Sequence, residues 1–175
     1  MADDANPMGF RIRRSGAIIG VPLREQNDIA RQVAKDAADY WYDNFLEKHF
    51  THAGAAEYGY KPRNGERDNP GEKGFWASYT GRKLKKWGHT RPLMWTGDSY
   101  EWLKSRKRFK ITATGGQAKA RIMLGAPNFN WHNPNSQINM DEEITTVSDS
   151  ERATLLDLIK KRFVELYTAR RAALK

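Results

Sequence analysis

The feature that most constrains this fold is a stretch of alternating apolar and polar residues centred on a glycine pair. The apolar members of the alternation are Phe109, Ile111, Ala113, Ala118, Ala120, Ile122 and Leu124. A period of two is that of a strand with one buried face, and Gly115-Gly116 suits a tight reversal between two strands. The stretch 107–124 is therefore predicted to be an antiparallel hairpin.

A helical pattern precedes the hairpin. Ile29, Val33 and Ala37 recur every four residues, which places them on one face of a helix. The apolar stripe continues toward residue 50, and Gly54 follows as a candidate stop signal. We expect a long N-terminal helix over about 24–50.

A second helical pattern closes the chain. Ser148 and Glu151 have the spacing of a capping box, in which the serine hydroxyl and the glutamate carboxylate each accept a backbone N–H of the other residue. Leu155 and Ile159 begin the apolar stripe that follows. We expect a C-terminal helix over about 149–172.

The first residues show a shorter alternation. Phe10 and Ile12 alternate with Arg11, which predicts a half-buried strand within an N-terminal hairpin. The fold class is therefore predicted to be α+β, with a small antiparallel sheet packed against both helices. The predicted organisation is a flexible arm at 1–8 and one domain over 9–175, with long loops at about 54–74 and 125–141.

The positive charge of the chain is concentrated in its middle. The sequence holds 30 Lys and Arg against 21 Asp and Glu, a formal net charge of +9. Residues 61–110 contain 14 of the basic and 5 of the acidic residues, so the remainder is balanced at 16 of each sign. Phosphate is one natural counterion, and an acidic protein partner or a merely solvated surface are the alternatives.

Aromatic residues are interleaved with the basic ones between 75 and 108. Such interleaving favours core or subunit-interface anchors over which Arg and Lys stems pack, and base stacking is the alternative. No helix-turn-helix, aromatic RNA-binding strand pair or zinc-finger spacing accompanies it. The residues predicted to contact DNA or a protein partner are Lys83, Lys85, Lys86, Arg91, Arg106 and Arg108.

The sequence contains no specific motif for catalysis, cofactor binding or metal binding. The chain has no cysteine, no Gly-rich loop ending in Gly-Lys-Ser/Thr, and no Gly-x-Ser-x-Gly. His49 and His52 lie three apart, but a zinc site wants a third ligand, and a surface or interface pair is the alternative. Residues 141–143 are acidic, like the ligands of a two-metal site, and the alternative is that they are solvated surface charge. We expect no catalytic, cofactor or metal site and no enzyme.

The segment Arg91–Ser99 reads R-P-L-M-W-T-G-D-S. It resembles the P-L-x-x-T-G segment of tail-completion and virion-morphogenesis proteins of tailed bacteriophages. In that family a long helix precedes the segment, a β-hairpin follows it, and a closing helix comes last. Met140–Phe163 is similar to the terminal segment of the phage Mu type, and together the resemblances span about 29–166.

The resemblance implies a structural, non-enzymatic virion protein. Family members sit at the neck or the head-proximal end of the tail and help join the tail to the DNA-filled head. The implied role is a ring-forming adaptor in virion assembly, present in the host cytoplasm until it enters the virion. Its implied partners are further copies of the chain and phage connector, neck or tail-tube proteins, with non-specific contact to DNA in the lumen.

Within the matching segment, the family motif falls on residues that shape the backbone. Pro92 stiffens the approach and Thr96-Gly97 is predicted to reverse the chain before the sheet. The structural turn therefore comprises Pro92, Leu93, Thr96 and Gly97. The alternatives are a basic nucleic-acid-binding or processing protein, and a capsid or baseplate component. The acidic start and the short apolar stretches predict a soluble protein with no signal peptide and no membrane partner.

Overall fold

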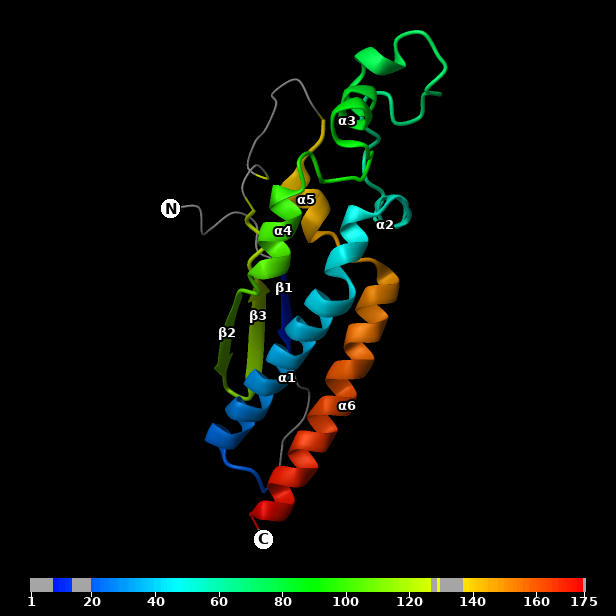
Figure 1. The fold of residues 1–175 in the computed structure, drawn as a ribbon. Helices are drawn as coiled ribbons and strands as arrows, with labels where there is room; N and C mark the ends of the chain where they lie inside the picture. Colours follow the sequence, from blue (N-terminus) through cyan, green and yellow to red (C-terminus); the bar gives the residue numbers. More distant parts are fainter. Residues whose placement is uncertain (1–7, 14–19, 127–128, 130–136, 175) are drawn as a thin grey trace. The chain divides into compact units, whose positions relative to one another are not determined.

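The computed structural model describes residues 8–13, 20–126, 129 and 137–174 (Figure 1). Contacts divide the chain into two compact units, where the sequence predicts one domain over 9–175. The sheet unit comprises Pro7–Leu46, Lys107–Leu124 and Val147–Lys175. The described part of the helical unit lies within Glu47–Arg106 and Gly125–Thr146.

The sheet unit contains three antiparallel strands in the order β1-β3-β2. β2 (Phe109–Thr114) and β3 (Gln117–Ile122) form the predicted hairpin, and both turn glycines have positive φ angles of 63° and 72°. This backbone region carries no steric penalty in glycine. The hairpin prediction is therefore confirmed.

β1 (Met8–Ile12) is the first of the two extended pieces predicted near the N-terminus. It pairs with β3 from Met8 opposite Ile122 to Ile12 opposite Ala118, rather than with its sequence neighbour. Residues 14–19, where the predicted N-terminal hairpin would turn, lie outside the described residues, as do residues 1–7 of the predicted arm. Met8 is 5% exposed and belongs to the sheet.

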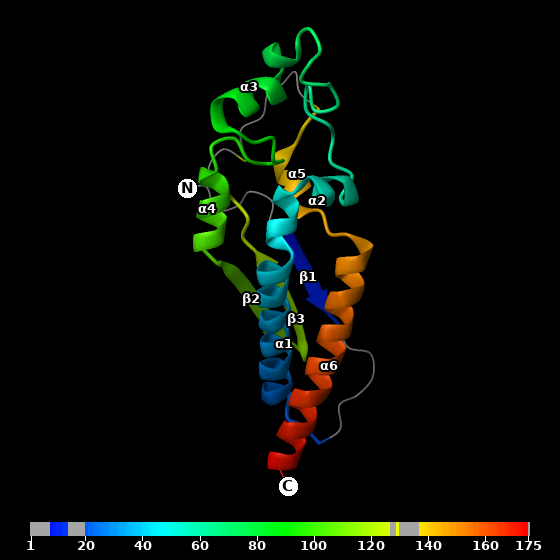
Figure 2. The same ribbon diagram turned by 45° about the vertical axis from the view of Figure 1, so that its right-hand side comes forward.

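Helix α1 (Leu23–Asn44) lies across one face of the sheet, and α6 (Asp149–Ala173) runs along α1 (Figures 1 and 2). The core between them includes Ile29 and Val33 of α1, with Ile159 and Phe163 of α6 packed against them. The Ser148–Glu151 capping box is present at the start of α6, with Ser148 Oγ accepting from the Glu151 N–H at 3.3 Å. The predicted α+β packing is confirmed.

The first helix ends earlier than predicted. α1 stops at Asn44, and a 3-10 helix, η1 (Leu46–Phe50), follows it. Gly54 is not a stop signal, because it lies inside α2 (His52–Glu57). A Cβ at Gly54 would stand 1.9 Å from the Lys48 carbonyl oxygen, so glycine is needed for the close approach of η1 to α2.

The helical unit holds more regular structure than the sequence indicated. α2 occupies the start of the predicted loop 54–74, and η2 (Phe75–Ala77) and α3 (Tyr79–Trp87) come after that loop. α4 (Asp98–Ser105) and α5 (Met140–Thr145) complete the unit. Much of the predicted loop 125–141 lies outside the described residues. Within the described ranges, none of the helices has both the length and the apolar character that crossing a membrane requires.

Candidate functional site

The basic aromatic segment is built on the short helix α3. The Ser78 side chain caps this helix by accepting from the Gly81 N–H at 3.0 Å, and Gly88 ends it in the left-handed region with a φ of 70°. A Cβ at Gly81 would stand 2.1 Å from the Phe75 carbonyl oxygen. These three small residues therefore set where α3 begins and ends and how closely η2 packs against it.

Lys83 lies on the inner face of α3. Its side chain is buried, with the residue 3% exposed, and its Nζ donates to the carbonyl oxygen of Arg91. Burial, assisted by the Arg63 charge, lowers the pKa of Lys83 to about 8. Lys83 therefore holds the 88–91 connection against the helix, and its ammonium is not on the surface where the predicted contact would need it.

The motif segment forms a turn, as its residues suggest, but the turn leads into α4 rather than directly into the sheet. Pro92 and Leu93 are buried, and Leu93 adopts a positive φ of 53°, which is strained for a residue with a Cβ. Gly97, at a φ of 102°, precedes the first residue of α4, and Thr96 Oγ1 accepts from the Asp98 N–H at 3.2 Å.

The turn presents an aromatic side chain. Trp95 is 38% exposed, and its ring lies 5.1 Å from that of Tyr79 on α3. Trp76 and Trp87 are also exposed, at 50% and 38%. Exposed tryptophans are uncommon on a free surface and are enriched where proteins bind partners.

Several cations of the segment lie over aromatic rings. Lys86 Nζ is 4.9 Å from the ring centre of Trp87, and the Arg106 guanidinium is 5.2 Å from that of Trp102. The Arg91 guanidinium lies 5.6 Å from the ring of Tyr100. Such cation–π contacts order long side chains without removing their charge. The segment can thus present ordered positive charge beside aromatic surface.

The six predicted contact residues differ in their burial and in the unit to which they belong. Lys85 and Lys86 are exposed on the last turn of α3. Arg91 and Arg106 are in the same unit, over their aromatic partners, and Lys83 is internal. Arg108 belongs to the sheet unit. We use the name aromatic–basic surface for the exposed side chains of the helical unit at Trp76, Trp87, Trp95, Lys85 and Lys86.

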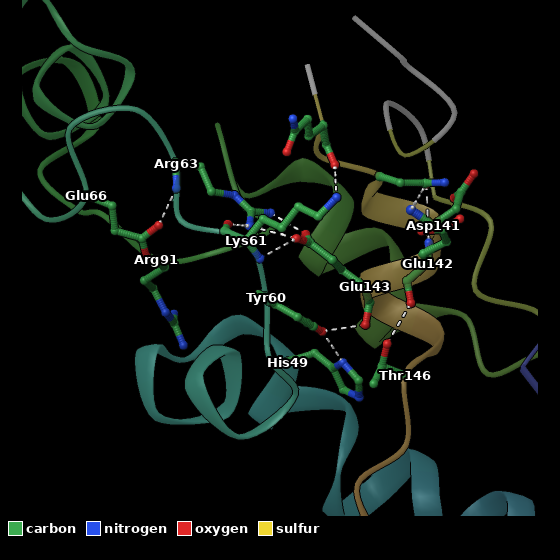
Figure 3. A network of polar contacts seen from close by, with 12 residues as sticks. His49, Tyr60, Lys61, Arg63, Glu66, Arg91, Asp141, Glu142, Glu143 and Thr146 are labelled. Atoms are coloured by element: carbon green, nitrogen blue, oxygen red, sulfur yellow. Dashed lines mark hydrogen bonds and ion pairs between the residues drawn. The ribbon is translucent and has the colours of Figure 1, made fainter.

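A buried polar network, which no sequence motif predicts, also lies in the helical unit (Figure 3). The Arg63 guanidinium faces the Glu143 carboxylate, with Nη1 2.9 Å from Oε1 and a second contact from Nη2 to Oε2. Each side chain is 10% exposed. The Lys61 N–H also donates to Glu143 Oε1 at 3.3 Å. Glu143 is therefore a structural partner of the 60–66 segment, not solvated charge.

His49 extends this network into the core. Tyr60 donates its hydroxyl hydrogen to the Glu143 carbonyl oxygen at 2.6 Å, so its oxygen accepts from His49 Nδ1. The imidazole is fully buried and stacks on Tyr58 with ring centres 4.1 Å apart. Burial lowers the pKa of His49 to about 3. The predicted neighbour, His52, is instead exposed and contacts Thr90 Oγ1 at 2.9 Å.

No local pattern in the sequence could have revealed this network, because its two charged members are 80 positions apart. Among the described residues there is no group of three or more His, Asp or Glu that could hold a metal ion. The helical unit thus combines exposed positive charge and exposed rings with a buried, hydrogen-bonded ion pair. Comparisons with protein-family models, with curated proteins and with solved structures found no match.

Proposed function

We propose that this protein is a structural component of a tailed-bacteriophage virion. In this proposal it acts without enzymatic activity at the neck or the head-proximal end of the tail, as a ring-forming adaptor during head–tail joining. The support comes from the resemblance of Arg91–Ser99 to the tail-completion motif and from the α+β order of elements. Its partners would be further copies of the chain and connector, neck or tail-tube proteins.

The observation that carries the proposal is the way the motif segment is built. Buried Pro92 and Leu93 anchor the turn, while Trp95 in the same turn stays 38% exposed beside Tyr79. A rigid turn that presents an exposed ring has the chemistry of an interface anchor. The strained φ of Leu93 fits this role, because strain persists only where the surrounding packing enforces one conformation.

The experiment is negative-stain imaging of the purified protein mixed with tail tubes of the phage that encodes it. We expect added density at one end of each tube. Trp95→Ala, combined with charge reversal of Lys85 and Lys86, should remove that density. The matched control reverses Lys160 and Lys161, which are exposed on α6.

Three results would count against this proposal. Tube ends that stay bare with folded wild-type protein would overturn it. Loss of the density in the α6 control, with no greater loss in the Trp95 variant, would show that the aromatic–basic surface is not the attachment site. Steady turnover of a substrate that one polar substitution abolishes would contradict the non-enzymatic role.

A further inference from the structure

The two faces of the sheet differ completely in character. The face toward α1 carries the apolar residues of each strand, which are buried on β3 at Ala118, Ala120 and Ile122 and partly buried along β2. The strand residues that point the other way are Gly9, Arg11, Lys110, Thr112, Thr114, Gln117, Lys119 and Arg121. All of these are exposed except Lys119, which is half-buried on the central strand. We call this surface the open sheet face.

The strand register brings cations together in pairs on the open sheet face. Arg11 of β1 lies directly opposite Lys119 of β3, and Lys110 of β2 lies directly opposite Arg121 of β3. Like charges in directly opposed positions of a sheet are destabilising. Arg11 is about a hundred residues from its partner in sequence, so this clustering depends on β1 joining the hairpin.

No acidic side chain offsets these charges within the strands. The sequences of β1, β2 and β3 contain no Asp or Glu. Across the described residues, the ion pairs of the structure include none with Arg11, Lys110, Lys119 or Arg121. By contrast, Lys107, two residues before the start of β2, contacts both Asp39 and Asp43 of α1. Among the described residues, the four cations of the open sheet face therefore have no ion-pair partner.

The spacing of the four cations suits a chain of phosphates. Directly opposed residues in a sheet have Cβ atoms about 5 Å apart, and alternate residues on one strand are about 7 Å apart. Lys119 and Arg121 thus form a short row along β3, flanked by one cation on each neighbouring strand. A Cβ at Gly9 would lie 3.7 Å from Arg121 Cγ, so that side chain passes close over a residue with no side chain of its own.

We propose that the open sheet face binds the phosphate backbone of double-stranded DNA without reading its sequence. Duplex DNA carries one negative charge per about 1.7 Å of its axis, which supplies the counter-charge that the four cations lack. Thr112, Thr114 and Gln117 on the same face can donate further hydrogen bonds to phosphate oxygens. The proposal concerns the sheet unit alone and holds whether or not the chain is a neck protein.

The composition of the face favours DNA backbone over a protein partner or single strands. Protein interfaces depend on buried aromatic or aliphatic anchors, and single-strand binding depends on rings that stack on bases. The outward positions of the three strands supply neither, since all are Gly, Arg, Lys, Thr or Gln. The exposed tryptophans lie in the other unit.

The test is fluorescence anisotropy of a labelled 30-base-pair duplex of arbitrary sequence, titrated with the full chain at 50 and 200 mM salt. If four phosphates are neutralised, the affinity should fall about 150-fold between these salt concentrations, a logarithmic slope near −3.6. Lys119→Gln/Arg121→Gln should halve the slope, so that the same change of salt weakens binding only about 12-fold.

Two matched variants with the same change of net charge locate the site. Lys160→Gln/Lys161→Gln alters exposed cations of α6, and Lys85→Gln/Lys86→Gln alters those of α3. We expect both to keep a slope within about half a unit of wild type. Thermal melting checks folding, and the β3 variant should melt no lower than wild type because it relieves two like-charge pairs.

Four results would overturn the proposal. They are no measurable binding of the duplex at 50 mM salt, an unchanged slope in the folded β3 variant, an equal loss in the α6 or α3 variant, and much tighter binding of a single strand of the same length. Saturable binding of polyglutamate without binding of DNA would assign the face to an acidic protein. None of these results depends on the attachment of the chain to tail tubes, so they leave the neck proposal separately testable.

Discussion

Acidification should destabilise the helical unit through one buried histidine. His49 is fully buried, stacked on Tyr58 and bonded through Nδ1 to Tyr60, and its pKa falls from the ordinary 6.5 to about 3. In the unfolded chain the imidazole is hydrated and takes up a proton below pH 6.5. Between pH 6.5 and 3 the unfolded state therefore binds more protons, so the free energy of unfolding decreases as the pH falls.

The size of this effect follows from the pKa difference. Each pH unit within the window is worth about 1.4 kcal/mol, so lowering the pH from 6.5 to 4 should remove about 3 kcal/mol. The whole window amounts to about 5 kcal/mol, which is comparable to the entire stability of many small domains. A single side chain can thus set the acid limit of this unit.

The assay is urea unfolding at pH 7 and pH 4, followed by tryptophan fluorescence. Trp76, Trp87, Trp95 and Trp102 lie in the helical unit and the fully buried Trp41 lies in the sheet unit, so the signal reports on both units. Because other groups also titrate, the measured quantity is the difference between wild type and His49→Asn, which offers an amide near the Nδ1 position and has no proton to gain.

We expect His49→Asn to be less stable than wild type at pH 7, since it loses ring packing, and to lose about 3 kcal/mol less on going to pH 4. The control is His52→Asn, at an exposed position three residues away, which should follow the wild-type pH response. If His49→Asn keeps the full wild-type decrease, then the imidazole is not held neutral by burial and the reasoning is refuted.

Three further predictions concern the same unit. Arg63→Ala should lower the free energy of unfolding by about 3–5 kcal/mol by leaving the Glu143 charge unpaired, whereas Arg63→Met/Glu143→Met should stay within about 1 kcal/mol of wild type; equal losses in urea titrations would contradict this. The pKa of Lys83, about 8 when folded against 10.5 in the unfolded chain, means that the unfolded state binds more protons between these pH values. Wild type should therefore gain about 3 kcal/mol relative to Lys83→Met from pH 8 to 10.5, and a constant difference would refute the burial of its charge. Leu93→Gly should be about 1 kcal/mol less destabilising than Leu93→Ala, since only glycine relieves the positive φ; the opposite order in thermal melts would exclude that strain.

The sequence predicts the parts of this fold that local physics determines. The β2–β3 hairpin depends on alternation and two glycines, and the start of α6 depends on a hydroxyl and a carboxylate three residues apart. Both signals act within a few residues, so these two elements can be predicted without knowing how the chain packs. The predicted C-terminal end of the first helix was wrong. Leu46 and Phe50 continue the apolar stripe of α1, but the backbone there changes to a 3-10 helix.

The interior of the helical unit could not be predicted in the same way. Its central ion pair joins Arg63 to Glu143, and no periodicity relates these positions. The run of basic residues predicts Lys83 to be a surface cation like Lys85 and Lys86, but its position on the inner face of α3 buries it. Helix α3, which carries Lys83, is short and mostly polar, so its apolar periodicity is weak. It begins after Ser78 and ends at Gly88, and these two single residues are weak signals within a strongly basic segment.

Places where the chain departs from the local rules of stability are informative about function. Leu93 keeps a left-handed backbone in the motif turn, and the open sheet face keeps Arg11 opposite Lys119 and Lys110 opposite Arg121. The left-handed backbone of Leu93 costs about 1 kcal/mol, and each like-charge pair costs up to about 1 kcal/mol. The two proposals would give these local costs a physical reason, since an interface needs a fixed turn and a polyanion would offset the paired cations.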